Sequence, residues 1–127
     1  MFEGQLLFPA GPNPAVPYRL YGPWMLRRGD SVRCTVDVGA ISGAPVVDIE
    51  LFTKNTEDAG DGTNADAAAA TVIVANAIGR QTVEWLSAGN IALKELVRYR
   101  YTITGNAVTD WIIFRMLQPV WFDSLKA

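Results

Sequence analysis

Histidine is absent from the chain, and its absence limits the chemistry that the side chains can perform. Histidine is the commonest general base near neutral pH and belongs to the usual serine and cysteine nucleophile sets, so those sites are excluded. The one cysteine, Cys34, can form neither a thiolate zinc cluster nor an internal disulfide. The segment Gly60-Asp61-Gly62 lacks the Gly-Lys-Ser/Thr ending of a phosphate-binding loop. Any catalysis would have to use carboxylates, tyrosines or lysines.

Paired carboxylates are the remaining catalytic possibility, because glycosidases need only two of them. Asp48 and Glu50 share one face of a predicted strand, and Glu84 lies on another. Carboxylates on the wet face of a sheet are usually solvated or paired with arginine. We therefore expect a protein that is not an enzyme and has no cofactor.

A polar loop over residues 55–66 offers oxygen ligands at short spacing, namely Asp58, Asp61 and Asp66. Calcium prefers such clusters, which makes the three aspartates a weak candidate site. The spacing does not match the helix-loop-helix calcium pattern, which needs acids at alternate positions and a closing glutamate. We interpret the segment as an exposed loop and expect no metal.

Arginines and aromatic residues are the other candidates for function. Arg98, Arg100 and Arg115 could form a basic stripe across neighbouring strands, either paired with Asp48, Glu50 or Glu84 or free to bind an acidic partner surface. Aromatic rows can also bind sugars, and Trp and Tyr are enriched at protein interfaces. Most rings should belong to the core, whereas Trp24, Trp121 and Phe122 lie near the ends of apolar runs and are candidate interface anchors.

Period-two alternation predicts the strands that must position these side chains. It is cleanest at residues 31–38, 46–54 and 96–104, where Val32, Cys34, Val36 and Val38, for example, face one way. Residues 110–117 are apolar on both faces, which only a central or covered strand can be. The full set of predicted strands is residues 3–8, 18–26, 31–38, 46–54, 71–75, 80–86, 96–104 and 110–117, with turns at residues 27–30, 39–45 and 76–79 and a short helical turn at residues 67–70.

Four prolines between residues 9 and 17 exclude a helix there and cannot supply a central strand. We predict one domain over residues 1–127, with residues 1–17 as an extended proline-rich arm. About eight short strands without helices predict an all-β, two-sheet antiparallel sandwich of jelly-roll type, or alternatively an immunoglobulin-like one.

Charge and hydropathy narrow the class of partner. The chain has 127 residues, of which 50% are hydrophobic, and its net charge is −2. Such a balance lacks the basic excess typical of nucleic-acid binding. No apolar run is long enough to span a membrane, and residues 1–5 do not resemble a signal peptide. We therefore expect neither nucleic-acid nor membrane partners.

Four segments resemble small structural proteins of tailed phages and prophages: residues 3–9 (EGQLLFP), 21–24 (YGPW), 97–105 (VRYRYTITG) and 114–122 (FRMLQPVWF). The chain resembles capsid decoration, or cement, proteins with a jelly-roll body. The resemblance implies a virion protein that is made in the host cytoplasm, binds the exterior of the major capsid protein shell and bridges capsomers, often as a dimer or trimer.

The leading hypothesis is therefore a capsid decoration subunit, and the alternative is a carbohydrate-binding β-sandwich. An extended arm would lose little entropy on docking, and many copies would bind with avidity. The residues that we expect to contact partners are Phe8, Pro12, Pro14, Tyr18, Trp24, Arg98, Arg100, Trp121 and Phe122.

Overall fold

Every regular element in the described part of the chain is a β-strand. The structure is a computed structural model that describes residues 6–9, 18–65, 73–105 and 109–123. The strands are β1 (Leu6–Pro9), β2 (Tyr18–Tyr21), β3 (Met25–Leu26), β4 (Ser31–Ser42), β5 (Val46–Lys54), β6 (Thr63–Asn64), β7 (Ile73–Ala75), β8 (Gly79–Trp85), β9 (Leu96–Thr104), β10 (Trp111–Met116) and β11 (Val120–Phe122). Within these residues, no helix is long and apolar enough to cross a membrane.

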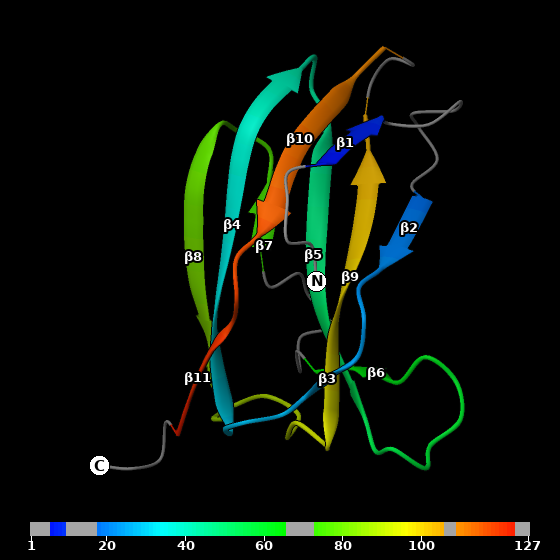
Figure 1. The fold of residues 1–127 in the computed structure, drawn as a ribbon, viewed down its shortest axis with the longest axis vertical. Coiled ribbons are helices and arrows are strands. Elements are labelled where there is room, and N and C mark those ends of the chain that lie inside the picture. Colours follow the sequence, from blue (N-terminus) through cyan, green and yellow to red (C-terminus); the bar gives the residue numbers. More distant parts are fainter. Residues whose placement is uncertain (1–5, 10–17, 66–72, 106–108, 124–127) are drawn as a thin grey trace.

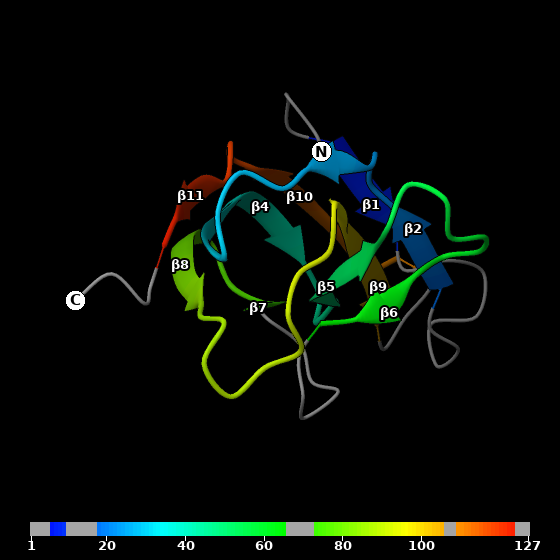
Figure 2. The ribbon, with the colours of Figure 1, turned by 90° about the horizontal axis from the view of Figure 1, so that it is seen from below.

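The strands form two antiparallel sheets that pack face to face (Figures 1 and 2). Sheet A contains β1, β10, β11, β4 and β8. On β4, β8 occupies one edge over residues 32–38, and β10 and β11 follow each other along the other edge. Sheet B is built on the full-length pairing of β5 with β9, with β2 and β3 beyond β9 and β6 and β7 beyond β5. Each sheet is therefore four strands wide.

The strand pairing is nested from the ends of the chain toward its middle. The first strand, β1, pairs with β10, and β2 pairs with β9. Further in, β4 pairs with β8, and β5 pairs with β6 and β7. The structure therefore confirms a two-sheet antiparallel sandwich, and its jelly-roll type stays a prediction. An immunoglobulin-like sandwich would place the first two strands side by side in one sheet, whereas here β1 and β2 lie in different sheets.

The core lies between the sheets and is supplied by the inward positions of the long strands. Alternate residues of β4, β5, β9 and β10 are buried, as period-two side-chain geometry requires. Tyr99, Tyr101 and Phe114 are the largest side chains that are fully buried. Their rings contact one another at centroid distances of 6.2 and 5.7 Å, in the tilted arrangement that aromatic pairs favour.

Several predicted boundaries were wrong. Residues 39–42, predicted as part of a turn, continue β4, because Ala40, Ile41 and Ser42 pair with β10 after a register shift. The predicted strand at residues 18–26 is broken at Gly22-Pro23 into β2 and β3, since proline cannot donate to a ladder. The strand predicted at residues 3–8 is confirmed over residues 6–8, where β1 pairs with β10 and continues to Pro9. Residues 10–17 and the helical turn at residues 67–70 lie outside the described residues.

Candidate protein-contact surfaces

Glu50 is held on the outer face of sheet B by three neighbouring side chains. Arg100, directly opposite on β9, donates from Nη2 to Oε2 at 2.5 Å and from Nε to Oε1 at 3.1 Å. Thr102 donates to Oε1 at 3.1 Å, and Asn64 donates to Oε2 at 3.3 Å. The Glu50 side chain is only 12% exposed. Both carboxylate oxygens are therefore engaged in a structural cross-strand network.

The other predicted carboxylates do not complete an acid pair with Glu50. Burial, together with the nearby Glu50 charge, raises the pKa of Asp48 above its ordinary value. Glu84 lies on β8 in the other sheet, where its carboxylate meets Arg33 Nη2 at 2.9 Å. The arrangement therefore brings no free pair of facing carboxylates together among Asp48, Glu50 and Glu84.

Arg98 forms the centre of a second cluster on the same face as Glu50. Its guanidinium carbon lies 4.4 Å from the ring centroid of Tyr21 and 4.3 Å from that of Trp24, both typical of cation–π contacts. Its Nη2 also donates to Asp61 at 2.9 Å. The Lys54 ammonium lies 4.9 Å from the same Trp24 ring. The cluster therefore ties β2, β9 and the loop after β5 together.

This cluster limits what the aromatic rings can bind. Sugar-binding aromatics need open ring faces, whereas Arg98 already lies over both Tyr21 and Trp24. Phe52 is buried and has the Arg100 guanidinium 4.4 Å from its ring centroid. Tyr21 remains exposed. The cation–π contacts occupy ring surface that a sugar would need and favour a structural role for these aromatics.

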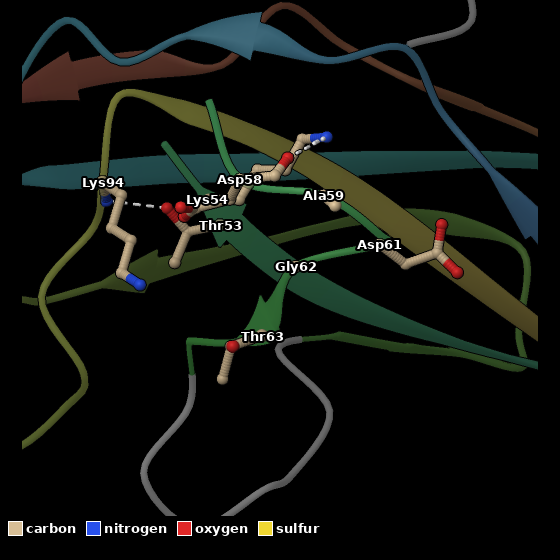
Figure 3. A pocket seen from close by; sticks show the side chains of 8 residues that line it. All are labelled: Thr53, Lys54, Asp58, Ala59, Asp61, Gly62, Thr63 and Lys94. Carbon is tan, nitrogen blue, oxygen red and sulfur yellow. Dashed lines mark hydrogen bonds between the residues drawn. The ribbon is translucent and has the colours of Figure 1, made fainter. Parts of the chain in front are cut away.

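A shallow, open hollow of about 470 Å³ lies beside the loop after β5 (Figure 3). The Lys54 ammonium occupies the loop, donating to the carbonyl oxygens of Asp58 at 3.4 Å and Gly60 at 3.2 Å. The Asp58 carboxylate accepts a hydrogen bond from the Asn55 amide, and Asp61 is paired with Arg98. The two carbonyl oxygens therefore already accept hydrogen bonds from Lys54, and the carboxylates of Asp58 and Asp61 already have partners of their own. No group of three or more acidic, cysteine or histidine ligands is present in the described part of the chain, and Asp66 lies outside it.

Large apolar side chains reach solvent near one end of the sandwich, on separate segments, and we call these residues together the apolar end: Leu26, Ile91, Val120, Trp121 and Phe122. Leu26 is 64% exposed and Val120 is 50% exposed. At the bottom of Figure 1, β11 lies beside the beginning of β4 in sheet A, whereas β3 belongs to sheet B. Leu26 pairs with Leu96 on the outer face of sheet B and Val120 pairs with Arg33 on the outer face of sheet A, so the two side chains lie on opposite faces of the sandwich.

Strand β11 holds the apolar end in place against β4. Phe122 pairs with Ser31, and Trp121 pairs with Val32 and packs against the core. A side chain at Gly29 would clash with the Phe122 backbone, since a Cβ atom there would lie 2.7 Å from the Phe122 carbonyl oxygen. Asp123 accepts a hydrogen bond from the Asp30 amide at 3.3 Å. The backbone of β11, which carries Trp121 and Phe122, is therefore fixed against β4.

The predicted contact residues fall into separate groups. Trp24, Arg98 and Arg100 lie together on the outer face of sheet B. Trp121 and Phe122 are half-buried in β11 of sheet A. Phe8 lies in β1 and Tyr18 begins β2, whereas Pro12 and Pro14 lie outside the described residues.

The predicted stripe that included Arg115 was wrong. Arg115 lies on β10 in sheet A, where its Nε approaches the Asp37 carboxylate at 3.3 Å. Arg100 shows the predicted cross-strand pairing with Glu50, whereas Arg98 pairs with Asp61 of the loop. The arginines are therefore distributed over two sheets and each has its own acidic partner.

Leu26, Ile91 and Val120 were missed by sequence reasoning. Leu26 ends the predicted strand at residues 18–26, directly before two arginines. Val120 follows Pro119, where the chain bends, and precedes the two aromatic candidates. The signal that could have found them is their placement at the ends of runs, which also marked Trp121 and Phe122.

Comparisons of the chain with protein-family models, with curated proteins and with solved structures gave no match.

Proposed function

We propose that this protein is a structural protein of a phage virion, a capsid decoration subunit that binds the outside of the shell of major capsid protein. The observation that carries the proposal is the exposure of large apolar side chains near one end of the sandwich: Val120, 50% exposed, lies next to the half-buried Trp121 and Phe122 on β11, and Leu26, 64% exposed, lies on β3 of the other sheet. Apolar and aromatic groups that are solvent-exposed on a fixed backbone are what a protein-binding surface requires.

The engagement of the polar groups also supports adhesion over catalysis. Glu50 accepts hydrogen bonds at both oxygens, Asp61 is paired with Arg98, and Glu84 is paired with Arg33. A general acid or base must be able to reach a substrate proton, whereas these carboxylates hold strands and loops together. Their role in this proposal is to stiffen the outer faces of the sandwich.

Modest contacts suffice for a decoration protein, because many copies bind to one shell. If copies are also linked to one another, the second binding event becomes intramolecular and the overall affinity rises without new contacts. Contact residues on a fixed backbone reduce the entropy lost on docking, and the extended arm predicted from the sequence would reduce it further. The jelly-roll body would then serve as the scaffold that presents these contact segments.

The first experiment asks whether the protein belongs to a particle. Phage particles released by cells that make the protein are banded by density, and the capsid band is analysed by mass spectrometry. The proposal predicts the chain in that band in an amount comparable to the capsid protein. A band that contains capsid protein without this chain would overturn the proposal.

The second experiment tests the apolar end. The double variant Leu26→Asp/Val120→Asp should lose binding to particles that lack the protein, because two charges would have to be desolvated in the contact. Thr109→Asp is the matched control, since Thr109 is exposed just before β10, at the opposite end of the sandwich. Removal of residues 1–17 is a poorer test, because it also removes β1 from sheet A.

A further inference from the structure

The β8 strand is an edge strand with one side left open. It pairs with β4 over seven residues, and no described strand pairs with its other edge. It lies at the outer margin of sheet A in Figure 1. Gly79 to Thr82 and Glu84 are exposed, and only Trp85 is buried. An open edge presents unpaired backbone groups that can accept another strand.

Two devices that block an open edge, a proline and a bulge, are absent from β8. Natural edge strands are protected by proline, by charged side chains and especially lysine, by a bulge or by a covering segment. The charged residues of β8 are Arg80 and Glu84, which have opposite signs. Residues 79–85 contain neither proline nor lysine, and their register with β4 runs without a shift from Gly79 to Trp85. The edge is therefore suitable for strand addition.

The outward-facing residues of β8 form a symmetric series around Thr82. Two residues before Thr82 is Arg80, and two residues after it is Glu84. Four residues before it is Ile78, which is 66% exposed, and four after it is Leu86, which is 42% exposed. Arg80 and Glu84, which lie at equal distances from Thr82, therefore carry opposite charges.

We propose that two copies of this chain associate by antiparallel pairing of β8 with β8, with a two-fold axis beside Thr82. In this register Arg80 lies opposite Glu84 of the second copy, and Glu84 lies opposite its Arg80. Thr82 lies opposite itself. Directly opposed residues of opposite charge stabilise an antiparallel pair, and like charges destabilise it.

The joined sheet would carry an alternating row of charges. Within one copy, Arg80 lies beside Asp37 with a closest Nε–Oδ1 distance of 3.9 Å, and Glu84 pairs with Arg33 at 2.9 Å. Across the two-fold axis the sequence of charges becomes Asp37, Arg80, then Glu84 and Arg33 of the second copy. Arg80 and Glu84 would thus each have opposite charges on both sides. The Thr35–Thr82 hydrogen bond at 2.9 Å would be continued as a row of four threonines.

Neighbouring registers lose this complementarity. A two-fold axis perpendicular to the sheet must pass beside one residue and its own copy. An axis beside Gln81 would place Arg80 opposite Thr82 and Glu84 opposite a position before the strand begins. An axis beside Val83 would place Glu84 opposite Thr82 and Arg80 opposite a position after the strand ends. Only the axis beside Thr82 places each charge of β8 opposite a residue of the other sign.

The test uses two variants that cannot pair with themselves but can pair with each other. Arg80→Glu places two pairs of glutamates opposite each other, and Glu84→Arg places two pairs of arginines. Each variant alone should dimerise at least about tenfold more weakly than the unchanged chain. An equimolar mixture restores both opposite-charge pairs and should form a heterodimer. Sedimentation velocity over a series of protein concentrations measures all three samples.

Controls separate the interface from a general effect of charge or folding. Arg115→Glu makes the same charge change on the outer face of sheet A but lies on β10, away from the β8 edge, so it should leave dimerisation unchanged. Thr82→Lys should abolish it, because two ammonium groups would meet at the axis. Hydrogen exchange of the β8 amides should slow as the protein concentration rises.

Two results would overturn this proposal. One is a chain that sediments as a monomer at every concentration. The other is an oligomer that Arg80→Glu, Glu84→Arg and Thr82→Lys all leave intact. Neither result depends on whether the protein binds a capsid, so the dimer and the decoration function can fail separately.

Discussion

Tyr99 donates a hydrogen bond of 3.1 Å to the sulfur of Cys34 and so links β9 of sheet B to β4 of sheet A across the core. The two residues are 65 positions apart in the chain, and both are buried. Burial raises the pKa of the Cys34 thiol to about 11, although the Tyr99 hydrogen bond acts in the opposite direction. The thiol is therefore neutral at physiological pH and closed to solvent.

The first prediction concerns the reactivity of this thiol. Because the thiolate is the reactive form, native Cys34 should not react with a maleimide at neutral pH unless the sandwich opens. Its labelling rate should follow the unfolded fraction. Tyr99→Phe should remove about 1 kcal/mol of stability and accelerate labelling roughly fivefold. Mass spectrometry of timed samples measures the rate, and rapid labelling of the folded protein would contradict the assignment.

The second prediction compares two cross-strand arginine–glutamate pairs. Glu50→Gln removes the charge that Arg100, Thr102 and Asn64 share in a largely buried site, and it should destabilise the fold by about 1.5–3 kcal/mol. Glu84→Gln breaks the Arg33 pair, whose side chains are 48% and 47% exposed, and it should cost at most about 1 kcal/mol. Urea unfolding in dilute solution measures both. Equal losses would show that burial does not distinguish the two pairs.

The long strands could be predicted closely from the sequence. For residues 46–54 and 96–104 the predicted and observed bounds are the same, because each strand alternates over its first six residues. In β4, the same alternation predicted the buried valines and Cys34 correctly. These strands carry most of the core, so local pattern and tertiary structure agree there.

Short strands could not be predicted in the same way. Thr63 and Asn64 form β6 because they pair with Phe52 and Thr53 of β5, and nothing in their own pattern indicates a strand. The continuation of β4 through Gly39 depends on β10, which becomes its neighbour only after the chain has folded. The pairing that forms β6 involves residues of a polar loop. The pairing that extends β4 involves residues distant in the sequence.

The candidate surfaces were only partly predictable for a related reason. The arginines and Trp24 were candidates because of their residue types, but the contacts between them were not predicted, and which acid each arginine meets depends on strand order. Arg98 meets Asp61 because the loop after β5 folds back over β9, and Arg115 is in the other sheet. The β8 edge could be recognised only when the pairing of β4 had been determined.

The third prediction concerns the same loop. Gly62 has a φ of +80°, and a Cβ atom there would lie 2.6 Å from the Thr53 carbonyl oxygen and 3.0 Å from the Trp24 ring. Gly60 has a similar φ of +85° but open space around it. Gly60→Ala should therefore cost only the backbone term of about 1–2 kcal/mol.

Gly62→Ala adds a backbone clash and should cost clearly more than Gly60→Ala, with an accompanying change in tryptophan fluorescence as Trp24 moves. Thermal unfolding and fluorescence of the two variants provide the comparison. Equal melting temperatures for the two variants would show that the loop does not pack against Thr53 and Trp24 in solution.

The last prediction is a pH dependence that arises at Asp48. Its pKa is raised in the folded protein, so the folded state holds this proton more tightly than the unfolded chain does. The contribution of Asp48 to stability is therefore most favourable below the ordinary aspartate pKa of about 4 and is lost as the pH rises through the raised value. Asp48→Asn removes the ionisation. At neutral pH the variant should be more stable, by about 0.5 kcal/mol or less because water still screens this carboxylate, and the advantage should vanish at acid pH. Urea unfolding of both proteins across the acid range checks the sign, and a variant that is less stable at neutral pH would show that the Asp48 charge is favourable in the fold.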